Sequence, residues 1–213
     1  YKTLTEKESH ALVSKQYEAS GKLINPKKNP IYRNISRHDS LQSEITPNVI
    51  SICVESLSAK FLGVFGNEKG LTPNLDKLSK DGVLFSNLYA TGTRTVRGME
   101  AITLSIPPTP GRSIVKRERN TGMFTIGEVF KNKGYTRNFY YGGDGYFDNM
   151  NTYFSGNGFN IIDRGRNFLL GDEIETTRTN INDDEVNFEN AWGVCDEDLF
   201  NKVLQQADLQ AVT

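Results

Sequence analysis

Two oxygen-bearing residues, Glu55 and Thr95, carry the chemistry that this sequence predicts. Glu55 directly follows an apolar run, residues 49–54. Thr95 ends a threonine-rich loop, residues 91–95, which follows a second apolar run, residues 83–89. If both runs are parallel strands, the loops beyond their carboxyl ends meet at one edge of a sheet, where α/β enzymes place their active sites. We therefore expect the two side chains to lie close together.

Glu55 is a candidate metal ligand. A carboxylate at the rim of a buried sheet needs a cation, hydrogen-bond donors or water, because an uncompensated charge there is costly. Its oxygen atoms suit a hard divalent cation such as Mg²⁺, Mn²⁺ or Ca²⁺. The alternative is that Glu55 caps the N-terminus of the following helix, where negative charge is favourable.

Thr95 is a candidate nucleophile. A threonine hydroxyl is a weak nucleophile at neutral pH unless a metal or an adjacent base activates it. Thr95 starts a predicted helix, whose N-terminus would help to hold an anionic phosphate, and Arg94 and Arg97 could add charge-assisted hydrogen bonds. The alternative is that Thr95 is only a helix cap, with Glu100 as its capping partner.

A glycine-rich loop, residues 142–149, follows a strand expected over residues 136–141. It contains Asp144, Phe147 and Asn149. Glycines after a strand, together with polar and aromatic side chains, could shape a ligand pocket. Alternatively, the same residues could simply form a tight turn.

Composition excludes several classes of protein. The chain has 213 residues, of which 37% are hydrophobic and 24% charged, so a packed core is expected rather than disorder. A net charge of −1 supplies no general field for nucleic acid, and we expect no nucleic-acid partner. No apolar run approaches the ~20 residues that span a bilayer. Because the chain begins at Tyr1 rather than Met, we expect the true N-terminus to lie upstream.

The order of the predicted elements indicates a layered α/β fold with a mostly parallel sheet. Residues 1–46 are expected to form an N-terminal helix and an extended connector, and residues 47–213 the α/β domain. Trp192 is expected to be a buried indole before a turn. Predicted strands cover residues 49–54, 83–89, 136–141 and 159–162, and predicted helices cover residues 5–19, 58–65, 73–81, 96–105, 125–133 and 197–207.

Several segments resemble the lipoteichoic acid synthase-like, phosphoglycerol-transferase branch of the alkaline phosphatase/sulfatase superfamily. The segments are NVISICVESLSAKFLG, GLTPNLDKLSKDGVLFSNLYATGTRTVRGMEA, SIPPTPG, GYTRNFYYGGDGYFDNMNTYF and NAWGVCDEDLF. The resemblance covers about residues 47–205. It implies an α/β sandwich around a largely parallel sheet, of which this chain would be the N-terminal portion, incomplete at its C-terminus.

The resemblance also implies a function. Glu55 would bind Mn²⁺ or Mg²⁺. Thr95 would bind the same metal and act as nucleophile, taking a phosphoglycerol group from a phospholipid donor and passing it to a hydroxyl of a glycan or polymer. The enzyme would work at the bacterial inner membrane, facing the periplasm or the extracellular side, and a membrane anchor would lie upstream of Tyr1. We expect substrate contacts from Arg94, Arg97, Tyr141, Asp144, Phe147 and Asn149.

Three departures from the family pattern limit this carry-over. The remaining metal ligands of the family are an Asp-His pair, which this sequence lacks, so we expect them beyond Thr213 and expect the isolated chain to be inactive. The C/S-x-P-x-R motif of true sulfatases is absent, which disfavours sulfate-ester hydrolysis. Tyr141, Asp148 and Met150 stand where lipoteichoic acid synthases have His, Trp and Arg, so the same polymer substrate is not inferred. The alternatives are a phosphoesterase of the same superfamily or a truncated, non-catalytic fragment.

Overall fold

The computed structural model describes residues 3–16, 22–23, 33–34, 46–107, 109–165 and 177–211. The chain divides into two compact units, residues 1–53 and 54–213, which are described separately. In the first unit, α1 (Glu6–Gln16) begins with the capping arrangement that the sequence predicts. The N–H of Thr5 donates to Oε2 of Glu8 at 2.8 Å, and the N–H of Glu8 donates to Oγ1 of Thr5 at 3.3 Å. Two short strands, β1 (Lys22–Leu23) and β2 (Arg33–Asn34), pair antiparallel.

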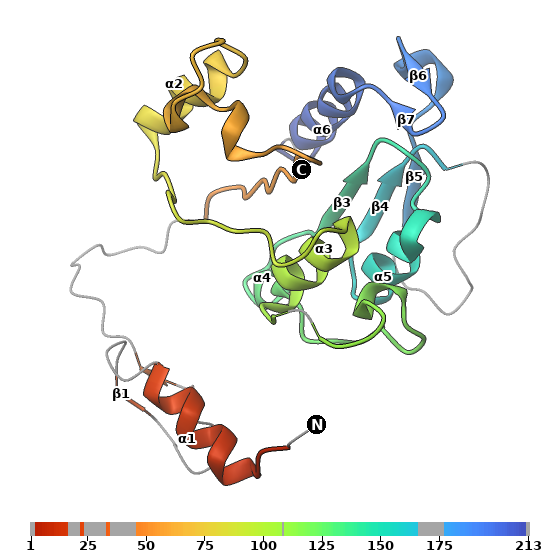
Figure 1. Cartoon of the computed structure of the whole chain (residues 1–213). Coiled ribbons are helices and arrows are strands. Elements are labelled where there is room, and N and C mark those ends of the chain that lie inside the picture. The colour runs from red at the N-terminus through yellow and green to blue at the C-terminus, as the bar shows by residue number, and fades with distance from the viewer. Residues whose placement is uncertain are drawn as a thin grey trace. The chain divides into compact units, whose positions relative to one another are not determined.

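A parallel sheet organises the second unit. Its strands are β3 (Asn138–Tyr141), β4 (Asn160–Asp163) and β5 (Arg178–Asn180), in the spatial order β3-β4-β5 (Figure 1). Parallel strands require long crossover connections, and α5 (Met150–Gly156) supplies the one between β3 and β4. The predicted α/β class with a parallel sheet is confirmed.

Most of the predicted helices are present in the second unit. Pro73 opens α2, where its missing N–H has no cost, and Gly82 follows the end of that helix. Among the described residues, no helix is both long and apolar enough to cross a bilayer. The remaining elements are the α-helices α2 (Pro73–Asp81), α3 (Thr95–Leu104), α4 (Ile126–Lys131) and α6 (Asp196–Ala211), the short 3₁₀ helices η2 (Ala59–Phe61), η3 (Gly63–Phe65), η4 (Ile114–Lys116), η5 (Phe147–Asn149) and η6 (Asp183–Glu185), and the antiparallel pair β6 (Glu189–Asn190) and β7 (Gly193–Val194).

The core lies between the sheet and the helices α3 and α5. Its buried side chains are Val96, Val115, Met150, Tyr153, Phe154 and Ile161. The Phe154 ring stacks on Phe139 of β3 with centroids 3.8 Å apart, and it meets the edge of Phe159 at 5.5 Å. This aromatic cluster fixes α5 on the sheet and so holds the loop that connects β3 to α5.

The predictions of strands over residues 49–54 and 83–89 were wrong. Both runs are described, and neither is assigned to a strand. Their side chains are exposed, with Ile52 at 61% and Val83 at 83% of full accessibility. A strand exists only when a neighbour accepts its backbone hydrogen bonds, and within the described residues neither run is paired with another strand. The apolar pattern therefore identifies segments that are suited to a sheet, but it does not show whether a partner strand lies beside them.

We predict that Phe154→Ala lowers the free energy of unfolding by about 3–5 kcal/mol, because it removes a buried ring and leaves a cavity between α5 and β3. Denaturant unfolding followed by circular dichroism measures the loss. Phe124→Ala is the matched control, because Phe124 is 72% exposed and should change stability little. Equal effects of the two substitutions would contradict the placement of the core.

Candidate active site

Glu55 and Thr95 meet in the structure, as expected, although the two strands on which that expectation rested are not formed. The Thr95 hydroxyl donates a hydrogen bond to Oε2 of Glu55 at 2.8 Å, although 40 positions separate the two residues. Thr95 is the first residue of α3 and is half-buried, whereas Glu55 lies in an exposed turn. A carboxylate oxygen and a hydroxyl oxygen are thus presented together at the surface.

Neither residue acts as the helix cap that the alternative interpretation required. Arg94 occupies the N-cap position of α3, with no side-chain hydrogen bond, and Thr95 lies inside the helix. The 3₁₀ helix that follows Glu55 has Ser58 at its N-cap. Glu100, the expected capping partner of Thr95, is fully buried and bonds elsewhere. The Thr95 hydroxyl is therefore directed at Glu55 rather than at its own backbone.

Buried Glu100 anchors the helix that carries Thr95. Its Oε1 accepts a hydrogen bond from Nη1 of Arg97 at 2.7 Å, and its Oε2 accepts from the Ser113 hydroxyl at 2.7 Å and the Ile114 N–H at 2.6 Å. Burial by itself raises the pKa of Glu100, but these hydrogen bonds and the Arg97 charge outweigh it and hold the pKa below its usual range. The first two turns of α3 are thereby tied to the 109–115 segment.

The two arginines predicted to bind substrate differ in their surroundings. The Arg97 guanidinium is occupied by Glu100 and by the carbonyls of Thr109, at 3.0 Å, and Gly111. Its donors serve the fold, and phosphate binding by this side chain stays a prediction. Arg94 is exposed beside Thr95, where its charge is available to an anion.

A buried ion pair shapes the glycine-rich loop. Asp163, at the end of β4, is fully buried and accepts two hydrogen bonds from Arg178 of β5, at 2.9 and 2.6 Å. The Gly145 N–H donates to the same carboxylate at 2.7 Å, and Arg178 also reaches Asp144 at 3.1 Å. Sequence reasoning missed both charged partners, because β5 lies in a polar stretch for which the sequence predicts no strand.

The far end of this loop has an unusual backbone. Asp148 and Asn149 have φ angles of 57° and 62°, in the left-handed region that side chains disfavour. Asn149 donates from Nδ2 to the Val115 carbonyl at 2.9 Å, and Lys116 forms an ion pair with Asp148. These contacts hold the turn that directs Phe147 outward. The Asn149 side chain is thereby used within the fold, and its role in substrate binding stays a prediction.

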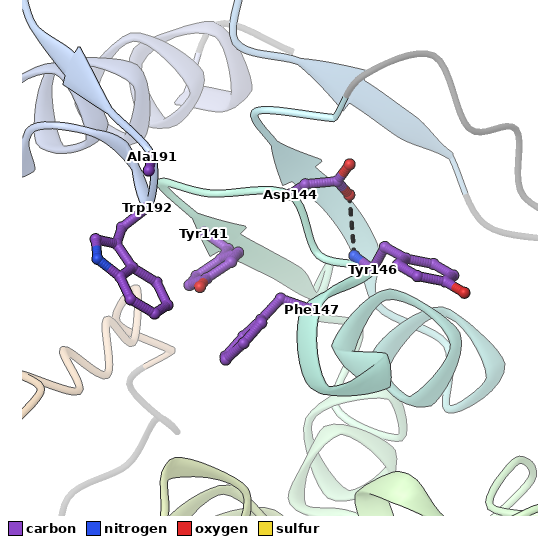
Figure 2. A pocket seen from close by; sticks show the side chains of 6 residues that line it. All are labelled: Tyr141, Asp144, Tyr146, Phe147, Ala191 and Trp192. Atoms are coloured by element: carbon purple, nitrogen blue, oxygen red, sulfur yellow. Dashed lines mark hydrogen bonds between the residues drawn. The ribbon is translucent and has the colours of Figure 1, made fainter.

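Three of the predicted substrate residues, Tyr141, Asp144 and Phe147, line an open pocket of about 290 Å³. Trp192 lines the same pocket and is 73% exposed, so the expectation of a buried indole was wrong. Figure 2 shows the Trp192, Tyr141 and Phe147 rings gathered on one side of the loop. The remaining lining residues are Tyr146, whose ring points away in that view, and Ala191.

Electrostatics couple this pocket to the Glu55–Thr95 pair. Burial raises the pKa of the Tyr141 hydroxyl, and the negative charges of Asp148, Glu55 and Asp144 raise it further. Tyr141 ends β3, so the carboxylate of Glu55 acts on the carboxyl edge of the sheet. The Glu55 carboxylate is therefore within electrostatic reach of Tyr141, one of the residues that line the pocket.

The donor chemistry of Glu55 and Thr95 fits part of a divalent-metal site. Carboxylate and hydroxyl oxygens 2.8 Å apart are near enough to contact one hard cation such as Mn²⁺ or Mg²⁺. Over the described residues, no group of three or more His, Cys, Asp or Glu side chains could complete such a site. The two oxygens account for one side of a coordination sphere.

Comparison with known proteins gives a consistent family. The sequence model of the family described as Sulfatase matches residues 47–211. A solved structure from Vibrio parahaemolyticus, described as a protein in the alkaline phosphatase superfamily, superimposes with a TM-score of 0.61 and 42% sequence identity. That match covers 74% of this chain and 35% of the solved chain.

Two curated relatives match shorter stretches. An ulvan-active sulfatase from Formosa agariphila is 33% identical over 79 residues, which is 37% of this chain and 13% of the relative. An N-acetylgalactosamine-6-O-sulfatase from Bacteroides thetaiotaomicron is 29% identical over 105 residues, 46% of this chain and 20% of the relative. The chain thus spans a minor part of each relative's length. These descriptions do not name the lipoteichoic acid synthase branch, which stays a prediction.

We predict that Glu100→Gln lowers the free energy of unfolding at pH 7 by about 3 kcal/mol, because Arg97 would lose its buried partner. A group whose pKa is lowered by folding stabilises the protein above its unfolded pKa, about 4.3, and loses that contribution as the pH falls through the folded value. The difference between wild type and variant should therefore shrink below about pH 4. Thermal and denaturant unfolding across this pH range measure it.

Glu118→Gln is the control, because Glu118 is exposed and its loss should change stability little. A Glu100→Gln variant as stable as wild type at pH 7 would contradict the role of this carboxylate in holding α3.

Proposed function

Because this chain belongs to the sulfatase family, we propose that it forms part of a metal-dependent phosphotransferase in which Thr95 is the nucleophile. The observation that carries the proposal is the 2.8 Å hydrogen bond from the Thr95 hydroxyl to Glu55. The substrate class is a phosphodiester of the phosphatidylglycerol type, and the group transferred is phosphoglycerol. A hydroxyl of a glycan or polymer is the acceptor.

The reaction would proceed in two balanced steps. First, Oγ1 of Thr95 bonds to the donor phosphorus and loses its proton, while the bond from phosphorus to the lipid oxygen breaks and that oxygen gains a proton. Second, the acceptor oxygen bonds to the phosphorus and loses its proton, and the bond to Thr95 breaks with return of a proton to Oγ1. The intermediate is a phosphodiester on Thr95.

The residues of this chain have distinct roles in these steps. Glu55 orients the Thr95 hydroxyl through Oε2, and Glu100 fixes the helix that carries it. Glu55 and Thr95 would hold Mn²⁺ or Mg²⁺. When bound, the metal would lower the pKa of the Thr95 hydroxyl and stabilise negative charge on the phosphoryl oxygens. Arg94 and the positive end of α3 favour an anionic phosphate beside Oγ1.

The enzyme would work at the bacterial inner membrane, with its catalytic domain facing the periplasm or the extracellular side, where phospholipid donors are within reach. The rival function is hydrolysis, in which water replaces the acceptor hydroxyl in the second step. The sulfatase names of two relatives favour testing it, although the sequence lacks the C/S-x-P-x-R motif. Assays of the full-length protein on phosphatidylglycerol and on aryl phosphate and aryl sulfate esters separate transfer from hydrolysis.

We predict that Thr95→Ala in the full-length protein lowers turnover of phosphatidylglycerol by more than about a thousandfold, because no other atom can form the intermediate. Mass spectrometry of wild type quenched during turnover should show the added phosphoglycerol on Thr95. Thr93→Ala is the matched control, because Thr93 is an exposed threonine of the same loop. Normal turnover by the Thr95→Ala variant would remove Thr95 from the mechanism.

We predict that Glu55→Gln weakens Mn²⁺ binding by about tenfold or more, because a neutral amide replaces a charged oxygen ligand. Isothermal titration calorimetry of the full-length protein with Mn²⁺ measures this without any substrate. Glu68→Gln, which changes an exposed carboxylate elsewhere in the second unit, should bind Mn²⁺ as wild type does. An unchanged titration for Glu55→Gln would exclude Glu55 as a ligand.

A further inference from the structure

The β6–β7 hairpin holds Trp192 in a defined place. Ala191 and Trp192 form its two-residue turn, and the Trp192 N–H donates to Oδ1 of Asn190 at 2.8 Å. The Val194 N–H donates to the Gly142 carbonyl at 2.8 Å, which ties the hairpin to the end of β3. The hairpin is therefore anchored beside the glycine-rich loop.

Glycine at position 193 makes this close approach possible. Its φ angle is +133°, and a Cβ there would lie 2.1 Å from the carbonyl oxygen of Gly142. Any larger residue would push the hairpin off the sheet edge. The position of the Trp192 ring thus follows from the backbone and is prepared before any ligand arrives.

The aromatic side of the pocket presents apolar surface that is exposed in this chain. Trp192 is 73% exposed and meets Phe147 edge to face, with centroids 6.0 Å apart at 87°. Tyr141 lies between these two rings in Figure 2. Within the described part of the chain, the indole N–H of Trp192 has no hydrogen-bond acceptor. An exposed ring with an unused donor on a rigid hairpin is a ready contact surface for a ligand.

The other side of the same hairpin is polar. A second hollow of about 210 Å³ adjoins the first, and Asp144 and Trp192 line both. Arg164, Glu189 and Asn190 line the second hollow as well. An aromatic platform therefore continues into a set of carboxylate, amide and guanidinium groups.

The charges of these groups disfavour an anionic ligand. Arg164 is already paired with Glu189 at 2.9 Å and with Asp183, and Arg178 is paired with Asp163 and Asp144. The carboxylates of Asp144 and Glu189 remain within the lining. A phosphate would meet paired cations and nearby carboxylates, whereas a neutral polyol would find donors and acceptors.

We propose that this hairpin site binds a neutral pyranose ring of an oligosaccharide, stacked on Trp192. A pyranose has a face of C–H groups with partial positive charge, which are attracted to the negative face of an aromatic ring. Its rim of hydroxyls can both donate to carboxylates such as Asp144 and accept from the indole N–H. That this sugar is the acceptor of the transferred group rests on the proposed function. That the hairpin site binds the sugar does not.

Trp192 is the only tryptophan in these 213 residues, so the part of the fluorescence change that the full-length protein loses in its Trp192→Phe variant reports on this site. The full-length protein is titrated with neutral tetrasaccharides of glucose, galactose and N-acetylgalactosamine, and separately with glycerol 1-phosphate. We expect a saturable fluorescence change with at least one tetrasaccharide and none with glycerol 1-phosphate. A response to glycerol 1-phosphate alone, or to none of these compounds, would overturn the proposal.

Substitutions test the stacking by calorimetry with the tetrasaccharide that binds. Trp192→Ala should lower affinity by about tenfold or more, and Trp192→Phe should retain most of it. Phe188→Ala is the matched control, because Phe188 is 61% exposed next to the same hairpin and lines neither hollow. Wild-type affinity in a folded Trp192→Ala variant, checked by circular dichroism, would overturn the stacking.

The Thr95→Ala variant separates this proposal from the proposed function. It should bind the tetrasaccharide as wild type does, because Thr95 lies outside the hairpin site. Sugar binding without any phosphotransfer by wild type would reject the proposed function and keep the site. Phosphotransfer without any sugar binding would reject the site and keep the function.

Discussion

The ion pair of the buried Asp163 carboxylate with Arg178 is the interaction on which the part of this fold around the glycine-rich loop depends. A charge in that position is tolerated only because Arg178 meets both of its oxygens and the Gly145 N–H adds a third hydrogen bond. Asp163 and its two partners come from two strands, β4 and β5, and from the glycine-rich loop. The same contact that stabilises the pairing of β4 with β5 therefore also determines the path of the chain beyond β3, and Asp144 takes its position from it.

A second buried carboxylate, that of Glu100, likewise anchors one element of the site to a neighbouring segment. Glu100 ties the start of α3 to the 109–115 segment, as Asp163 ties the glycine-rich loop to the sheet. Both are fully buried, and neither is directed at solvent. The candidate chemistry is carried instead by exposed or half-buried groups, Glu55 and Thr95, which are held by these buried supports. Rigidity and reactivity are thus assigned to different residues.

Local rules predicted from the sequence what depends on neighbours along the chain. The Thr5–Glu8 cap and the Pro73 helix start follow from residue types at short spacing. The meeting of Glu55 with Thr95, 40 positions apart, was expected from two strands that the structure does not contain. Partner-dependent features could not be predicted in this way.

The misses share a physical cause. The run 49–54 has the composition of a strand, but pairing is decided by what lies beside it. The short strand β5 is polar because its Arg178 faces a buried charge rather than an apolar layer. Trp192 looks like a core residue by type, yet the hairpin that carries it ends at the surface. In each instance tertiary context, which single-sequence patterns do not contain, overrides residue preference.

The left-handed backbone at Asp148 and Asn149 bears on how sequence similarity in this family should be interpreted. Apart from glycine, Asp and Asn are the residues that adopt this conformation at least cost, so the turn itself restricts which residues are acceptable there. Selection for the shape of the loop and selection for contact with a substrate would leave the same mark at these positions. A shared Asn at this position would therefore report the turn first, and the side chains that the turn exposes, such as Phe147, are better placed to distinguish one substrate from another.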